Sequence, residues 1–246
     1  MLDLLVGSRR GEFELELALQ ARGGSTTVIV GESGAGKTSV LRLAAGLDRP
    51  VTGRIVLDGE VYTDTAADIH VPPWRRSVGY VSQDYALFPH LSVAENVELP
   101  LTYRTGMPAA ERKKRVQESL ERVNMAHRMR HYPAQLSGGQ QRRVAVARAL
   151  VGSPSILLAD EPTGNLDSKN GEQVMALLAD LHADGATICI VTHDPRYAEY
   201  ADRKIHMFDG RVVDEETLNR LREEEDRRIA EQARRGRPAS ADLKED

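Results

Sequence analysis

The segment Gly31-Glu32-Ser33-Gly34-Ala35-Gly36-Lys37-Thr38 decides the fold of this chain. It matches the pattern G-x-x-x-x-G-K-[ST] and stands between the apolar run Val28–Val30 and an apolar segment, residues 40–45, that is patterned as a helix. Strand, glycine-rich turn and helix are the context in which this pattern indicates a phosphate-binding loop. A glycine-rich turn without a ligand is the ordinary alternative, but every fixed position of the pattern is matched.

The glycines, the lysine and the threonine of this loop are each expected to contact a different part of a bound nucleotide and its metal ion. Glycine lets successive backbone N–H groups turn towards an anion, and the following helix adds the positive end of its dipole. Lys37 can reach the β- and γ-phosphates of a nucleotide, and the Thr38 hydroxyl can bind Mg²⁺.

Composition limits what else the chain can be. Its 246 residues, 41% hydrophobic and 28% charged, suffice for one large α/β domain or two small ones with a packed core. The net charge of −4 gives no overall basic footprint for nucleic acid. Cys189, the lone cysteine, lies in an apolar run, which favours a small buried hydrophobe in a reducing compartment over a reactive thiol.

No segment of the sequence is patterned to enter a membrane. None approaches the roughly 20 apolar residues that span a bilayer. The N-terminus, with Asp3 and Arg9, does not resemble a signal peptide. We therefore expect that any work at a membrane depends on a partner.

Polar residues follow three further apolar runs at the points where those runs end. Residues 78–82 are followed by Gln83, residues 155–159 by Asp160 and Glu161, and residues 187–191 by Thr192 and His193. Ligands of α/β sheets bind at the carboxyl ends of the strands. Asp160 is suited to hold Mg²⁺ together with Thr38, and Glu161 can point at a water beside the γ-phosphate. The ordinary alternatives are a solvated glutamine, an acidic turn and a structural histidine.

A second anion site is predicted at Ser137, Gly138, Gly139 and Gln140. Ser137 occupies the position of an N-cap before a helix expected over residues 141–150. A hydroxyl, two glycines and a free set of helix N–H groups together suit an anion. Arg142, Arg143 and Arg148 would raise the positive potential there. Taken alone, the same residues could be only a cap and a turn.

The remaining chain predicts a domain with an insertion and a tail. Strands are expected over residues 2–6 and 13–19, and hairpins on Asp58-Gly59 and Asp209-Gly210. Residues 84–136 are largely helical in pattern, with helices over 91–99, where Ser92 is a plausible N-cap, and 108–124. Residues 214–246 are highly charged and predict a marginal helix followed by a disordered tail.

Five elements follow one another in the chain: the phosphate loop, the glutamine at a strand end, Leu-Ser-Gly-Gly-Gln, Asp-Glu after an apolar strand, and the final histidine. This order resembles the ATP-binding cassette (ABC) ATPases, the motor subunits of ABC transporters. The resemblance covers about residues 1–213 and is specific, because residues 136–140 match the family's own signature. It implies an α/β P-loop NTPase fold, with a mainly parallel core sheet, an antiparallel β subdomain and a helical insertion.

The resemblance also implies roles for the motif residues. Gly31–Ser39 would bind the ATP phosphates, and Thr38, Gln83 and Asp160 would surround Mg²⁺. Glu161 and His193 would be catalytic together with Lys37, and residues 164–167, ending in Asp167, would form the D-loop. Ser137 and Gly139, within the signature residues Ser137, Gly138, Gly139 and Gln140, would contact ATP bound by a second subunit. The implied assembly is a head-to-tail homodimer on an integral membrane permease at the cytoplasmic face, with no nucleic acid.

Two features depart from this pattern or leave it open. The loop 7–11 lacks the aromatic residue that stacks on adenine in this family, so Phe13, expected mainly as a strand core residue, Arg9 or Arg10 would have to serve. Residues 71–90 resemble molybdate- or sulfate-type importers, whereas residues 160–167 are similar to lipoprotein-release and macrolide-exporter ATPases. Residues 85–89 are expected either to face the permease or to lie in the core of the insertion.

Two other functions remain as alternatives. One is a non-transport ABC ATPase that acts on nucleic acid or the ribosome, but such proteins usually carry a coiled-coil insertion or two cassettes in one chain. The other is a regulatory module that binds ATP without turnover, against which Glu161 and His193 argue.

Overall fold

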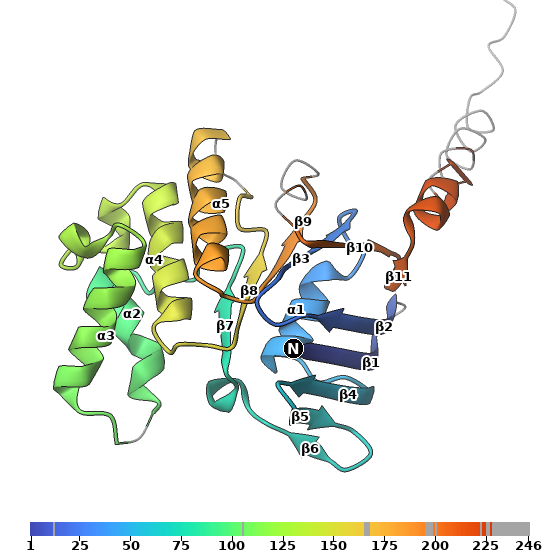
Figure 1. Ribbon diagram of the computed structural model, residues 1–246, viewed down its shortest axis with the longest axis horizontal. Helices are drawn as coiled ribbons and strands as arrows, with labels where there is room; N and C mark the ends of the chain where they lie inside the picture. Colours follow the sequence, from blue (N-terminus) through green and yellow to red (C-terminus); the bar gives the residue numbers. More distant parts are fainter. Residues whose placement is uncertain are drawn as a thin grey trace, which may run out of the picture. The chain divides into compact units, whose positions relative to one another are not determined.

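The computed structural model describes residues 1–11, 13–104, 106–164, 168–194, 199, 201–221, 223–224 and 227. The chain divides into two compact units, Met1–Val212 and Val213–Asp246. In the first unit the described strands join in one 11-stranded sheet, in the order β6-β5-β4-β1-β2-β11-β10-β3-β9-β8-β7 (Figure 1). The expected combination of a parallel core, an antiparallel part and a helical insertion is present.

The parallel part of the sheet carries the ligand-binding edge. It consists of β7 (Val78–Val81), β8 (Ile156–Asp160), β9 (Ile188–Thr192), β3 (Thr26–Gly31) and β10 (Arg203–Phe208). Neighbours run parallel, so their carboxyl ends meet at one edge. Every residue of β8 and β9 is buried, as expected for strands covered on both faces.

The antiparallel part continues the same sheet (Figure 1). Its strands are β1 (Leu2–Arg10), β2 (Phe13–Ala21), β4 (Thr52–Leu57), β5 (Glu60–Asp64) and β6 (Ile69–His70). Short β11 (Arg211–Val213) pairs with β2. Along β2, Leu15, Leu17 and Leu19 are buried while the glutamates between them are exposed, which is the alternation that a half-buried strand requires.

Two apolar cores cover the two faces of the parallel strands. Leu157 and Ile190 face a core that contains residues of α2 (Val93–Thr102), α3 (Ala109–Arg122), α4 (Gly138–Leu150) and α5 (Ser168–Ala183). Leu158 and Val191, one residue on, face a core shared by α1 (Lys37–Ala45) and the antiparallel strands. The period of two along a strand thus divides the apolar residues between the cores.

The helical insertion is held by capped helices. α2 packs against α3 and α4, as Figure 1 shows at the left. Ser92 caps α2 in a capping box with Glu95. Buried Asn96 ties the preceding loop to α2, because its amide donates to the carbonyls of Phe88, Leu91 and Ser92 and accepts from the Phe88 N–H. Single 3₁₀ turns lie at Pro73–Arg75, Ala126–Arg128 and Pro133–Gln135.

Two helices begin earlier than their apolar patterns indicate. α1 begins at Lys37 and α4 at Gly138, directly after the caps Gly36 and Ser137. The polar first turns carry no apolar periodicity, so the pattern starts only where the helix meets the core. Cys189 is buried as expected, and burial raises the pKa of its thiol to about 12.

The second unit contains helical residues 215–221. Asp214 caps them, since its carboxylate accepts the Thr217 N–H at 2.7 Å. Residues 228–246 of the predicted charged tail lie outside the described residues. Over the described part of the chain, no helix combines the length and apolarity that crossing a membrane requires.

Candidate functional site

The phosphate loop lines a cavity of about 560 Å³ at the carboxyl edge of the parallel strands. Gly34 and Gly36 have φ angles of 88° and 94°, which favour glycine. A Cβ on Gly36 would also lie 2.8 Å from the Phe13 ring. The residues that line the cavity are Phe13, Ser33, Gly34, Gly36, Lys37, Thr38, Ser39, Gln83, Glu161 and His193. The structure therefore gathers the loop with residues at the ends of β7, β8 and β9.

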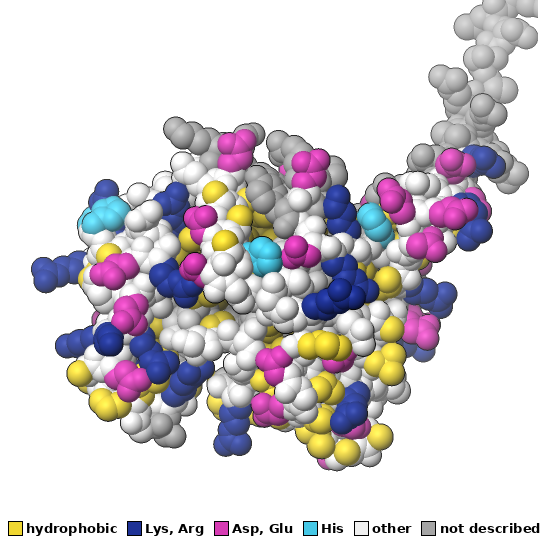
Figure 2. All heavy atoms as spheres, viewed as in Figure 1, with side chains coloured by type: hydrophobic (Ala, Val, Ile, Leu, Met, Phe, Trp, Pro, Cys, Tyr) yellow, Lys and Arg dark blue, Asp and Glu magenta, His cyan; other side chains and the backbone are white. Residues whose placement is uncertain are grey.

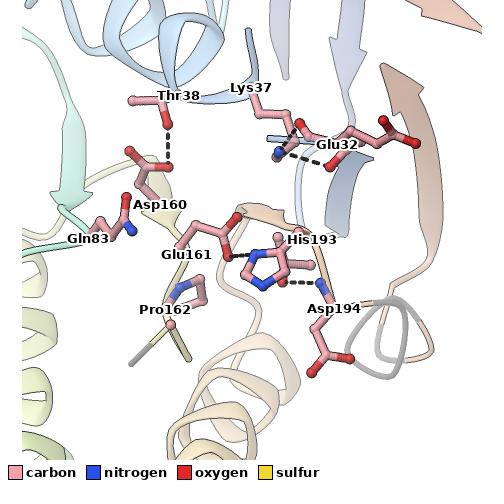
Figure 3. A network of polar contacts seen from close by, with 12 residues as sticks. Glu32, Lys37, Thr38, Gln83, Asp160, Glu161, Pro162, His193 and Asp194 are labelled. Atoms are coloured by element: carbon pink, nitrogen blue, oxygen red, sulfur yellow. Dashed lines mark hydrogen bonds and ion pairs between the residues drawn. The ribbon is translucent and has the colours of Figure 1, made fainter. Parts of the chain in front are cut away.

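Lys37 is buried against its own loop. Its ammonium donates to the carbonyl oxygens of Gly31 at 2.9 Å and Glu32 at 2.7 Å (Figure 3). Burial lowers the pKa of Lys37, while the negative charge of Glu161 and Asp160 opposes that shift. A phosphate in the cavity would stabilise the same ammonium, so the position suits an anion-binding lysine.

Asp160 and Thr38 form the oxygen-rich part of the site. Asp160 is 3% exposed, and burial raises the pKa of its carboxyl group. The Thr38 hydroxyl donates to Asp160 Oδ1 at 3.0 Å, and the Tyr80 hydroxyl donates to Oδ2 at 3.1 Å. Tyr80 was not among the residues expected at the site.

The donor set fits Mg²⁺ when a nucleotide supplies further oxygens. Within the described residues, no cluster of three or more His, Cys, Asp or Glu could hold a metal alone. Mg²⁺ is commonly bound by one or two carboxylates together with substrate phosphates. One buried carboxylate, the Thr38 hydroxyl and the Gln83 side chain offer that combination beside the phosphate loop (Figure 3).

Glu161 turns back into the cavity from the end of β8. Its φ angle of 48° is unusual for a residue with a side chain and costs on the order of 1–3 kcal/mol. The turn is held by hydrogen bonds from Glu161 N–H to Val191 and from Gly164 N–H to Glu161, at 2.9 and 3.0 Å. Glu161 Oε2 lies 2.9 Å from His193 Nδ1, and the two side chains point toward one another in Figure 3.

The signature segment forms a second, separate helix terminus. The Ser137 hydroxyl accepts the Gln140 N–H at 3.4 Å, and Gln140 Oε1 accepts the Ser137 N–H at 3.1 Å. The buried Gly139 leaves no room for a Cβ, which would lie 2.7 Å from Asn170 Oδ1. None of residues 137–140 is among the described residues that line the cavity. Asp167, also expected to bind the nucleotide, lies outside the described residues.

Two of the three arginines after the signature, Arg142 and Arg148, donate to backbone carbonyls, and Arg143 donates to a side chain. Arg142 is fully buried; it donates to the carbonyls of Pro162 and Gly164 and, at 3.5 Å, to that of Gln83. Arg143 donates to Gln173 at 2.6 Å. The helical spacing of Arg142 from buried Ala145 and Val146 is the signal that could have placed it inside.

Arg148 holds a strained segment just after Gln83. Tyr85 and Ala86 have φ angles of 58° and 45°, and Arg148 donates to both carbonyls, at 2.7 and 2.6 Å. The Arg142 guanidinium lies 4.3 Å from the centre of the Tyr85 ring. Two consecutive non-glycine residues with positive φ angles keep this conformation only when contacts from other parts of the chain stabilise it.

Phe13 combines a core contact with a place in the cavity, the two positions considered for it. It begins β2 and is partly buried against the apolar core, yet its ring also lines the cavity over Gly36. Arg9, another candidate for contacting a base, donates to the Gly11 carbonyl at 3.3 Å, and the side chain of Arg10 lies outside the described part of the chain. A smaller cavity of about 170 Å³ joins Phe13 to Arg9 and Arg49.

Comparison with known proteins finds close relatives over most of the chain. Residues 15–164 match the model of the ABC transporter family. The macrolide export ATP-binding/permease protein MacB of Brucella melitensis is 45% identical over 82% of the chain, which spans only 31% of that relative's length. An uncharacterized ABC transporter ATP-binding protein of Thermotoga maritima is 44% identical over 77% of the chain and 80% of its own length.

A solved structure matches the fold. A dimeric ATP-binding cassette in a post-hydrolysis state, bound to ADP and Pi, is 39% identical with a TM-score of 0.73. The match covers 87% of this chain and 97% of that one.

Proposed function

The chain belongs to the ABC transporter family, and from that premise we propose that its two anion-binding segments are halves of composite ATP sites, each completed by a second copy of the chain. It is an ATP-binding and ATP-hydrolysing cassette. One observation carries the proposal: the cavity holds the phosphate loop, Glu161 and His193 but lacks residues 137–140. The helix terminus at Ser137 of one chain can meet the open side of the cavity on another.

The residues of the cavity divide the work of phosphoryl transfer. The loop N–H groups and Lys37 bind the phosphates; Thr38, Asp160 and Gln83 would hold Mg²⁺, which would supply positive charge to the phosphate oxygens. Glu161 orients a water and accepts its proton, which its position beside the cavity allows. His193, paired with Glu161, keeps that carboxylate aimed at the water beside the γ-phosphate.

The second copy supplies the remaining donors. Ser137 and the N–H groups at the start of α4 bind the γ-phosphate held by the partner, with the helix dipole favouring the anion. Because each chain gives a phosphate loop and receives a signature segment, the arrangement is a head-to-tail pair with twofold symmetry. Asp167, the last residue of the proposed D-loop, would contribute to nucleotide binding.

Residues 1–213 act as the ATPase domain in this proposal, with residues 84–136 as a helical insertion and residues 214–246 as a tail. The insertion borders a groove of about 430 Å³ between the 3₁₀ turn Pro73–Arg75 and α2. Trp74, Phe88 and Tyr103 are 63%, 43% and 64% exposed there. Large apolar side chains left exposed together mark interaction surfaces.

The proposed occupant of this groove is a cytoplasmic segment of an integral membrane permease, which would hold the cassette at the membrane. The groove adjoins the segment after Gln83: Ala86 and Phe88 line it, whereas Tyr85 and Leu87 pack against the core. Residues 85–89 thus divide between the two roles considered for them. The first relatives join an ATP-binding part and a permease in one chain by name, which supports such a partner.

Surface charge gives little support to the alternative of an ATPase acting on nucleic acid. On the face shown in Figure 2, Lys and Arg side chains are interspersed with Asp and Glu. Phosphate backbones are usually bound by a continuous basic patch or stripe. In this proposal the permease chooses the transported substrate and its direction, and the names of relatives such as the macrolide export protein MacB favour export.

Groove substitutions test the permease assignment. We expect the pair Trp74→Ser and Phe88→Glu to abolish co-purification of a multispanning membrane protein from detergent extracts while ATP affinity stays within about twofold, because truncating central aromatic anchors typically costs 2 kcal/mol or more. Ile69→Glu, at a residue 40% exposed on β6, is the matched control. Equal recovery with the groove pair and the control would refute this surface as the permease contact.

A further inference from the structure

We propose that Tyr80 is a positioning residue of the magnesium site, whose hydroxyl fixes the Asp160 carboxylate so that one oxygen faces the metal. The inference rests on the proposed function, because it assumes that Asp160 and Thr38 hold Mg²⁺ with ATP. It concerns a hydroxyl outside the sequence motifs, contributed by strand β7.

Strand pairing brings Tyr80 to Asp160. β7 and β8 run parallel, with Tyr80 beside Leu158, so Asp160 is the diagonal neighbour two residues further along β8. Residues two apart on a strand share a face, and a long aromatic side chain spans the diagonal distance. Tyr80 is partly buried against the core that contains Leu158, while its hydroxyl donates to Asp160 Oδ2.

The two hydroxyl groups that donate to Asp160 would be affected differently by a bound metal. The Thr38 hydroxyl, 3.0 Å from Oδ1, is itself a proposed ligand and must share its oxygen with the metal. The Tyr80 hydroxyl, 3.1 Å from Oδ2, comes from strand β7 and is not a proposed metal ligand. Tyr80 can therefore keep one carboxylate oxygen occupied while Oδ1 turns to the metal.

Removing the hydroxyl alone isolates this role. Phenylalanine fills the same space in the core, so Tyr80→Phe frees Asp160 Oδ2 without opening a cavity. Partners that orient a metal-binding carboxylate typically change metal affinity about 10- to 100-fold when lost. Tyr62→Phe is the matched control, because it removes a hydroxyl that accepts the Ser77 N–H at 2.9 Å, remote from the cavity.

The test is Mn²⁺ binding followed by electron paramagnetic resonance in the presence of ATP, with Glu161→Gln in every protein so that ATP is not consumed. We expect the Mn²⁺ dissociation constant to rise about tenfold in Tyr80→Phe and to stay unchanged in Tyr62→Phe. Metal-free ATP affinity should be equal in all three proteins. The Mg²⁺ concentration for half-maximal turnover, measured with Glu161 intact, should rise by the same factor.

Each other outcome overturns the proposal. An unchanged Mn²⁺ dissociation constant in Tyr80→Phe, or an equal rise in the Tyr62→Phe control, would assign Tyr80 to packing alone. If the reference protein bound ATP but no Mn²⁺, the metal site of the proposed function would be wrong as well. This result differs from a failure of the Tyr80 proposal alone, in which the reference protein still binds Mn²⁺.

Discussion

Replacing Glu161 with glutamine lowers the ATP turnover rate by about 100- to 10,000-fold, the contribution typical of a positioned general base. The amide keeps the size of the side chain and can still accept a hydrogen bond from His193 Nδ1, 2.9 Å from Oε2 in the native pair. It cannot accept a proton from water at neutral pH. Phosphate release under saturating ATP and Mg²⁺ measures the loss.

The same substitution should accumulate an ATP-bound dimer, visible by size-exclusion chromatography with ATP and absent with ADP. Glu118→Gln is the control, since Glu118 is an exposed carboxylate on α3 that lies 3.8 Å from Lys114. Turnover surviving in Glu161→Gln would remove Glu161 from the catalytic role and leave the acidic strand end as a structural turn.

Replacing Ser137 with aspartate abolishes most turnover but leaves ATP binding to the isolated chain unchanged. Aspartate caps helices about as well as serine, so α4 keeps its N-terminus. Its carboxylate, however, would face the γ-phosphate of ATP held by a second chain. Because the loss of a single donor to a developing oxyanion can cost about 100- to 1,000-fold, we expect a decrease of at least about 100-fold.

Two comparisons separate charge from capping. Ser137→Asn also keeps a good cap without the charge, so its turnover should exceed that of Ser137→Asp. Ser92→Asp alters the other serine capping box, on α2, whose residues do not line the nucleotide cavity. Turnover and ATP binding are measured for each protein. A Ser137→Asp protein that loses ATP affinity as a monomer would contradict a site shared between chains.

The sequence was informative wherever chemistry and strand pattern coincide. Gly31–Thr38, Gln83, Asp160, Glu161 and His193 each follow an apolar strand, and parallel pairing places such strand ends at one edge. Local pattern was therefore enough to predict that these residues meet. It also predicted the hairpin between β4 and β5 and the capped start of α2.

Contacts between neighbouring strands and between helices could not be predicted from the local sequence pattern. In the sequence, Tyr80 is an ordinary aromatic residue of a strand. Only the register of β7 and β8 shows that its hydroxyl lies beside Asp160. Arg142 reads as a charge on a helix surface, but tertiary packing turns it to the carbonyls around Gln83 and Gly164. Phe13 likewise meets Gly36 only once β2 is packed beside the phosphate loop.

The central claim is that each ATP site takes one half from each of two chains, and mixing two inactive variants tests it most directly. Lys37→Ala damages the phosphate-loop half, and Ser137→Asp damages the signature half. When the two are mixed, about half of the dimers pair unlike chains, and each of those keeps one undamaged site. The account predicts recovery to about a quarter of the native phosphate-release rate if the two sites turn over independently. Differently tagged chains would demonstrate that mixed dimers have formed. If the mixture then stays as inactive as either variant alone, the composite site is contradicted.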